Sequence, residues 1–157
     1  MNITLRIATA DDISAVLQLY AQPGLDDGKI LSVPEAQQIW QRFASYPNYK
    51  LFVACETGNS TDPATSGEVV GSYALLVMHN LAHQGTPSAI AEDVVVAPHR
   101  QGAGIGRLMM AHAVEQARQA GCYKLALSSN KKRHAAHAFY ESLGFSQHGL
   151  SFVIETS

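Results

Sequence analysis

Residues 94 to 107 read VVVAPHRQGAGIGR. Three consecutive valines, Val94, Val95 and Val96, predict a central strand that is buried on both faces. The strand runs into a proline, then a glycine-rich turn and the start of a helix. Glycine lets the backbone approach a ligand closely, and a helix N-terminus offers unpaired N–H groups to an anion. The stretch therefore predicts a cradle for a pyrophosphate, built around Gly102, Gly104 and Gly106.

The spacing of these glycines helps to indicate which class of pyrophosphate-containing ligand the cradle binds. A dinucleotide-binding fingerprint needs G-x-G-x-x-G early in the chain and an acid about 20 residues later. Here the spacing is G-x-G-x-G, past mid-chain, and the next predicted strand ends at Ser128 and Ser129. A phosphate-binding P-loop needs G-K-[ST] after its glycines, which the stretch lacks. An ordinary glycine-rich turn and a dinucleotide-binding enzyme remain as weaker alternatives.

Outward from this stretch, the sequence predicts one mixed α/β domain over residues 1–157. Capping-box patterns start two helices, at Thr9 and at Ser32, and a polar loop from Thr57 to Gly67 joins a hairpin. The order of elements is β-α-α-β-β-β-α-β-α-β, with a possible further strand at the end. The strands are predicted over 2–8, 50–56, 68–79, 88–97, 123–128 and from 145 onward, and the two later helices over 104–120 and 131–143.

Composition excludes several classes of protein. Of the 157 residues, 46% are apolar and 15% charged, and the net charge is -2. No overall basic field therefore draws the chain to nucleic acid or to anionic lipid. No run has the roughly 18 apolar residues of a membrane span, and the first residues lack a signal-peptide pattern. Cys55 and Cys122 have neither metal-ligand spacing nor the numbers of a disulfide framework. We expect a cytoplasmic protein with no nucleic-acid or membrane partner.

Two motifs carry a resemblance to a known family. Residues 101–106, QGAGIG, match the pattern Q/R-x-x-G-x-G/A of the GNAT acetyltransferases. Residues 137–145, HAFYESLGF, resemble the A-x-x-F-Y-x-x-x-G-F ending of the same family. The order of elements is similar over nearly the whole chain. The resemblance implies a single N-acetyltransferase domain with a mixed, mostly antiparallel sheet of six to seven strands and about four helices, in the order β-α-α-β-β-β-α-β-α-β-β. It also implies acetyl-CoA as cosubstrate and no metal.

The resemblance further implies which residues bind the cosubstrate. In the family, the strand before the cradle splays from its neighbour at a β-bulge and pairs with the pantetheine arm. That role falls here to the strand of Val94, Val95 and Val96. The pyrophosphate would be held by backbone amides of the turn, and further contacts would come from side chains after the next strand. The implied binding residues are Arg100, Gln101, Gly102, Ala103, Gly104, Ile105, Gly106, Arg107, Asn130, His137 and Tyr140.

Catalytic roles follow from the chemistry of amine acetylation. Tyr140 is the candidate acid, since a phenol with a pKa near 10 is protonated at neutral pH and can donate to a departing thiolate. Its alternative role is core packing. Strand alternation points Glu92 and Asp93 to opposite faces, so one of them could be the base, directly or through water, and the resemblance favours Glu92. The alternative for this pair is a solvated strand edge. Ser128 or Ser129 would stabilise the oxyanion.

Asp26 and Asp27 lie in the loop between the first two helices, where the family shapes its acceptor pocket. They, with Glu92, would bind a cationic amine, or the two aspartates would only form a turn with Gly28. His134 and His137 have an H-x-x-H spacing, but without a third ligand nearby we predict no metal site.

The predicted function is direct acetyl transfer, in a ternary complex, to the primary amine of a small molecule. A protein lysine or N-terminal acetyltransferase and a non-catalytic sensor or partner protein that binds CoA or acyl-CoA are the alternatives. A homodimer is possible through the short apolar C-terminal segment with Leu150, Phe152 and Ile154.

Overall fold

The computed structural model describes residues 2–58 and 67–156. The chain divides into two compact units, Met1–Ala126 and Leu127–Ser157. Of the polar loop predicted over 57–67, Thr57 ends a strand, Gly58 and Gly67 flank the gap, and the rest lies outside the described residues.

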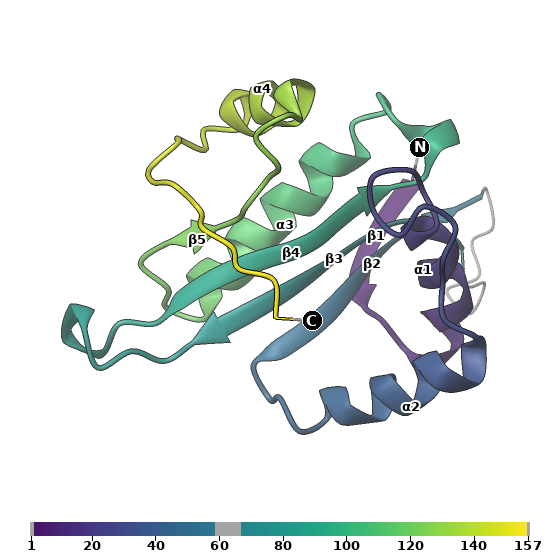
Figure 1. Cartoon of the computed structure of the whole chain (residues 1–157), viewed down its shortest axis with the longest axis horizontal. Helices are drawn as coiled ribbons and strands as arrows, with labels where there is room; N and C mark the ends of the chain where they lie inside the picture. The colour runs from purple at the N-terminus through teal and green to yellow at the C-terminus, as the bar shows by residue number, and fades with distance from the viewer. Residues whose placement is uncertain (1, 59–66, 157) are drawn as a thin grey trace. The chain divides into compact units, whose positions relative to one another are not determined.

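The first unit is built on one five-stranded sheet, ordered β1-β2-β3-β4-β5 (Figure 1). Neighbours among the first four strands are antiparallel, and β5 pairs with β4 in parallel. The long strands β2 and β3 are rich in apolar and β-branched residues and are almost completely buried at their centres. The strands are β1 (Asn2–Ile7), β2 (Tyr49–Thr57), β3 (Glu68–Met78), β4 (Ser88–Val96) and β5 (Leu125–Ala126).

Helices cover both faces of this sheet. On β3, Tyr73 faces α3, where its hydroxyl and His112 Nδ1 share a hydrogen bond of 2.6 Å. Its neighbour Ser72 pairs in register with Val95, which packs against Leu19 of α1. Because successive side chains of a strand point to opposite faces, α1 and α3 cover opposite faces. The helices of this unit are α1 (Ile13–Tyr20), α2 (Val33–Phe43) and α3 (Ile105–Gln119).

Both predicted capping boxes are confirmed. Thr9 and Asp12 form the first around a short 3-10 turn, Ala10–Asp12, that leads into α1. Asp12 is also bound by both guanidinium nitrogens of Arg6, at 2.6 and 2.8 Å. The hydrogen bond from Arg6, together with the amide and hydroxyl of Thr9, lowers the pKa of the buried Asp12 carboxyl. Ser32 and Glu35 form the second box, at the start of α2.

The second unit contains one helix, α4 (His134–Ser142), within its described residues. The helix was predicted from residue 131, but it begins later because the Asn130 side chain accepts the Lys132 amide at 2.9 Å and closes a turn there. Gly144, with φ 92°, follows the end of α4 as predicted.

The predicted strand count is wrong. The sheet has five strands rather than six to seven, the strand over 123–128 shortens to two residues, and the described residues after 145 contain no strand. The element order therefore ends at the last helix, without the final two strands. A strand requires a backbone partner, which an alternating sequence alone does not provide. The side chains of Leu150, Phe152, Val153 and Ile154 are instead 85–90% exposed.

Within the described residues, the helices are too short or too polar to span a lipid bilayer.

Candidate active site

The predicted anion cradle lies between β4 and α3. A 3-10 turn, Pro98–Arg100, leads into Gly102 and Gly104, whose φ angles of 79° and 84° are left-handed. The first hydrogen bond of α3 joins the Leu108 amide to the Gly104 carbonyl, at 3.1 Å. The three amides before Leu108, at residues 105–107, therefore have no acceptor within the helix and are available to an anion.

Not every amide of the predicted cradle is equally available. The Gln101 amide donates to the Pro98 carbonyl at 3.3 Å, and the Ala103 amide donates to the Arg100 carbonyl at 3.4 Å. These two long bonds shape the turn itself. The strongest part of the cradle is thus the first turn of α3, where Arg107 also places an exposed positive charge.

Gly71 on β3 allows the start of α3 to pack closely on the sheet, a role that the sequence reasoning missed. A Cβ atom built at Gly71 would lie 2.6 Å from Met109 Sδ, 3.4 Å from Ile105 Cγ2 and 3.2 Å from the Val95 carbonyl oxygen. Only glycine lets the start of α3 pack this closely on the sheet. The available signal was a glycine inside an otherwise apolar strand, VVGSYALLV.

A β-bulge interrupts β4 just before the cradle, as the resemblance implied. In the pairing of β3 with β4, Ala74 is opposite Glu92 and Ser72 is opposite Val95. Asp93 and Val94 together therefore face a single residue of β3, and Asp93 has a left-handed φ of 51°.

Beyond the bulge, one edge of β4 is open. β5 pairs with β4 only at Ala89 and Ile90, so the later residues of β4 have no strand neighbour on that side among the described residues. The predicted burial on both faces holds for Val95 alone, because Val94 and Val96 are half-buried. The exposed backbone of this edge can pair with an extended ligand.

The bulge also brings Asp93 to the loop that follows α1. This loop docks on the end of β4, where the Gln22 side chain donates to the Val96 carbonyl at 3.2 Å and Leu25 packs beside Val95. Partial desolvation, followed by the charge of Asp26, raises the pKa of Asp93, although the residue remains exposed at the surface. The two carboxyl groups therefore lie within electrostatic range of each other.

Two tyrosines, Tyr20 and Tyr49, lie near these acids. Together with Asp93 and Asp26 they form the acidic cluster at the bulge. Burial, followed by the charge of Asp93, raises the pKa of Tyr20 far above its usual range. Burial and the charges of Asp93 and Glu92 raise the pKa of Tyr49. Sequence reasoning named Asp26 and favoured Glu92 over Asp93 as the base, and it missed Tyr20 and Tyr49. Alternation along a strand predicts which face of the sheet a side chain points to only where the pairing is regular. The bulge inserts an extra residue at Asp93 and so shifts this alternation.

Asp27 has a structural role in its own loop. Its carboxylate accepts the Gly24 amide at 2.7 Å, and its φ of 49° is left-handed. This arrangement agrees with the turn-forming alternative for Asp27 and leaves Asp26 as the loop's acid beside β4.

Arg100, predicted to contact the cosubstrate, has a protein partner. Its Nη2 forms an ion pair with the Glu56 carboxylate at the end of β2. The neighbouring His99 pairs with Glu68 at 3.2 Å, at the start of β3. The turn before the cradle is thereby attached to the base of the β2–β3 hairpin.

The second unit holds the other predicted residues. Burial raises the pKa of the Tyr140 phenol, and the ring packs against Phe139 and Phe145 with centroids 5.2 and 5.9 Å apart. The His137 ring and the Asn130 carbonyl share a hydrogen bond of 2.9 Å, so these two residues form one local structure. Ser128 is exposed, whereas the Ser129 hydroxyl is buried and has no hydrogen-bond partner among the described residues.

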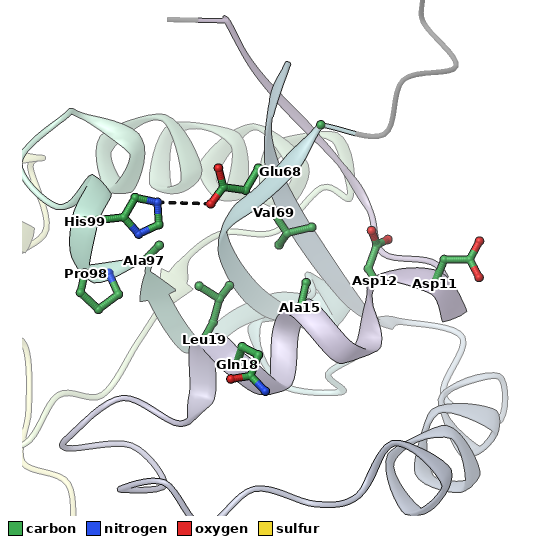
Figure 2. A pocket seen from close by; sticks show the side chains of 11 residues that line it. Asp11, Asp12, Ala15, Gln18, Leu19, Glu68, Val69, Ala97, Pro98 and His99 are labelled. Atoms are coloured by element: carbon green, nitrogen blue, oxygen red, sulfur yellow. Dashed lines mark ion pairs between the residues drawn. The ribbon is translucent and has the colours of Figure 1, made fainter. Parts of the chain in front are cut away.

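A cavity of about 580 Å³ lies elsewhere in the first unit, between α1, the start of β3 and the turn after β4 (Figure 2). Its lining includes the apolar residues Leu19 and Val69, and its carboxylates include Asp12, which binds Arg6, and Glu68, which pairs with His99. It contains none of the residues of the acidic cluster at the bulge. In the described part of the chain, no three His, Cys, Asp or Glu side chains are grouped as a metal site would require.

Known proteins match both the sequence and the fold. The profile of the Acetyltransferase (GNAT) family matches residues 13–145. An aminoglycoside N(6')-acetyltransferase type 1 of Stenotrophomonas maltophilia is 30% identical over 148 residues, which cover 92% of this chain and 86% of that protein. Glucosamine 6-phosphate N-acetyltransferase of Trypanosoma brucei brucei is 39% identical over 83 residues, 53% of this chain and 54% of that protein.

The chain spans about half the length of the first curated relatives that it matches. Among solved structures, a candidate acetyltransferase from Agrobacterium tumefaciens str. C58 has a TM-score of 0.84 and 35% identity, covering 98% of this chain and 99% of that one. The family profile and this likeness both extend over most of the chain. The chain therefore belongs to the GNAT family of acetyltransferases.

Proposed function

We propose that the protein is an acetyl-CoA-dependent N-acetyltransferase that acts on a small-molecule primary amine by direct transfer in a ternary complex. The observation that carries the proposal is the open edge of β4 beyond its bulge, which leads directly into a glycine turn and the free amides of α3. An extended arm that ends in a pyrophosphate fits these two features in this order. Acetyl-CoA has that form, and when bound it supplies an activated thioester.

The chain's own residues would bind the cosubstrate through backbone groups. The amides of residues 105–107 would bind the pyrophosphate, with Arg107 adding charge and Gly102 and Gly104 keeping the approach clear. The backbone of Val94 to Val96 would pair with the pantetheine arm. In the second unit, Asn130 and His137 are proposed to add polar contacts.

Proton transfers are assigned to an acid and a base. We propose that the base belongs to the Glu92–Asp93 pair and favour Asp93, because the bulge places it with Asp26, Tyr20 and Tyr49. A carboxylate there attracts an ammonium group and takes its proton before attack. Tyr140 would donate a proton to the leaving sulfur, since burial keeps its phenol protonated at neutral pH. The Ser128 hydroxyl is the candidate hydrogen-bond donor to the oxyanion.

The acceptor is proposed to be cationic. Asp26, Glu92 and Asp93 concentrate negative charge beside the bulge, and this charge favours ammonium groups over phosphorylated amines. The relatives' names include acceptors of both kinds: an aminoglycoside on one side, and glucosamine 6-phosphate and an aminoalkylphosphonate on the other. The acidic cluster supports the former class.

Self-association is a further part of the proposal. The apolar side chains of Leu150, Phe152 and Ile154 are 85–89% exposed, and an exposed apolar segment of this kind is typical of a contact surface. We propose that they contribute to a homodimer, which sedimentation of the wild type and of a Phe152→Ser variant would test.

Two experiments test the proposal. Calorimetry with CoA should give a saturable binding isotherm for the wild type. Thiol release from acetyl-CoA should then increase when polyamines, aminoglycosides or amino sugars are added, and a phosphorylated amino sugar should be a poorer acceptor than its unphosphorylated form. A protein that binds CoA but acetylates no amine in the panel would instead be a sensor. A preference for the phosphorylated amine would contradict the assigned acceptor class.

A further inference from the structure

Two acids at the base of the β2–β3 hairpin lie directly opposite each other. Glu56 on β2 and Glu68 on β3 are cross-strand partners. Like charges in this arrangement destabilise a sheet unless they are neutralised. Gly67, beside them, is so close to β2 that a Cβ atom there would lie 2.3 Å from the Glu56 carbonyl oxygen. The hairpin base is therefore tightly packed around Glu56.

Both acids are contacted by consecutive residues of the turn after β4. Arg100 pairs with Glu56 and His99 pairs with Glu68, the latter contact shown in Figure 2. The two pairs differ in burial. The Arg100 and Glu56 side chains are 27% and 23% exposed, whereas those of His99 and Glu68 are 61% and 62% exposed. Ion pairs near the surface contribute little, so the Glu56–Arg100 pair holds the turn more strongly.

The Glu56–Arg100 pair sits at the entry to the cradle. Arg100 ends the 3-10 turn, and its carbonyl accepts the Ala103 amide at 3.4 Å, within the glycine stretch itself. The Arg100 Nε is buried and has no hydrogen-bond partner among the described residues. The guanidinium is thus directed into the protein by one carboxylate, and its position fixes the backbone from which the cradle starts.

We infer that Glu56 is a positioning residue for the cradle and acts through Arg100, an inference that rests on the proposed function. Arg100 then serves the cosubstrate indirectly, by holding the turn, rather than by touching a phosphate. This assignment predicts the direction in which the affinity for CoA changes. Removing the Glu56 charge should loosen the turn and weaken CoA binding, whereas a phosphate-binding Arg100 released from Glu56 would bind CoA more tightly.

The first test needs no ligand. Amide hydrogen exchange of the free protein should become about tenfold faster in Glu56→Gln at the hydrogen-bonded amides of the turn, those of Arg100, Gln101 and Ala103, as expected when a constraint on a turn is lost. Glu68→Gln is the matched control, because it removes the exposed charge from the paired position. It should change exchange in this turn less than twofold. Equal exchange in the two variants would overturn the inference.

The second test is CoA binding by calorimetry. The dissociation constant should rise about fivefold in Glu56→Gln and more in Glu56→Ala, which also removes the hydrogen-bond acceptor, while Glu68→Gln stays within about twofold of the wild type. With acetyl-CoA the KM should rise and kcat should change little. Tighter binding in Glu56→Gln would overturn the inference.

Two further measurements separate the possible failures. A wild type that binds no CoA would contradict the proposed function, while the exchange result would still decide the role of Glu56. If Glu56→Gln does not fold, Glu56→Asp shortens the acid without removing its charge and should give an intermediate increase in exchange at the same three turn amides. Unchanged exchange in that variant would count against the inference.

Discussion

The two regions on either side of Val94, the acidic cluster at the bulge and the cradle after β4, are built in different ways. Towards α3, the cradle is built almost wholly from backbone: free amides, two left-handed glycines and the close approach allowed by Gly71. At the bulge, the cluster is built from side chains that come from three separate segments, namely Asp93, Asp26 with Tyr20, and Tyr49. The cradle suits a ligand shared by a whole family, and the cluster suits an acceptor particular to this chain.

This difference teaches which changes should alter binding and which should alter chemistry. Damage to the cradle should weaken CoA binding. Damage to the cluster should alter acceptor use and leave CoA binding intact.

The largest expected effect concerns the proposed acid. Tyr140→Phe removes the phenolic proton while keeping the ring that packs on Phe139 and Phe145. The kcat should fall by about 100-fold or more, the usual contribution of a positioned acid, while the CoA dissociation constant stays within about twofold. Stopped assays of thiol release together with calorimetry measure both quantities. A matching loss of CoA binding would show that Tyr140 belongs to cosubstrate binding instead.

The next effect distinguishes the two neighbouring acids. Asp93→Asn should lower kcat/KM for the amine by about 30-fold, within the range of a lost general base, and Glu92→Gln should lower it by less. Because partial desolvation and Asp26 raise the pKa of Asp93, the acidic limb of the wild-type rate profile should lie above the ordinary aspartate value of about 3.9. Asp26→Asn should move that limb to lower pH. A larger loss in Glu92→Gln would restore Glu92 as the base.

A smaller effect concerns the cradle, with a control on the same helix. Gly104, with φ 84°, caps the start of α3, and Gly121, with φ 74°, follows its end. Alanine at either position should cost about 1–2 kcal/mol of unfolding free energy, because a side chain strains left-handed backbone. Only Gly104→Ala should also weaken CoA binding, by about tenfold. Equal CoA affinity in the two variants would contradict the assigned cradle.

The smallest effect leaves both regions untouched. Burial lowers the pKa of His112, which lies on α3 against Tyr73. The unfolded chain then binds the proton more readily than the folded one, so stability falls as the pH drops below about 6.5, the ordinary histidine value. The change should be below about 1 kcal/mol and absent in His112→Phe. Urea unfolding at pH 7 and pH 5 measures it, and the wild type should lose more stability than the variant.

The glycine turn before α3 and the two capped helix starts could be predicted because their determinants are local. Thr9 with Asp12, and Ser32 with Glu35, define helix starts within four residues of sequence, and both capping boxes form. Of the three predicted glycines, Gly102 and Gly104 have left-handed φ angles, whereas Gly106 lies in the first turn of α3. The mixed sheet and the family also follow from the motifs and the order of elements.

The acidic cluster, the Glu56–Arg100 pair and the strand count depend on pairing between distant segments. The bulge at Asp93 exists only in register with Tyr73, and alternation along one strand does not reveal it. Arg100 resembles a free phosphate-binding cation until β2 places Glu56 beside it. The alternating segment at Leu150–Ile154 resembles a strand, but a strand requires a partner edge, which sequence periodicity does not specify.

The most direct test of the account is the rate of thiol release from acetyl-CoA by the wild type, with and without a cationic amine. The account predicts slow background hydrolysis, a rate that rises and saturates with the amine, and one acetylated amine formed for each thiol released. A rate that no amine increases, in a protein that binds CoA, would contradict acetyl transfer as the function of this site.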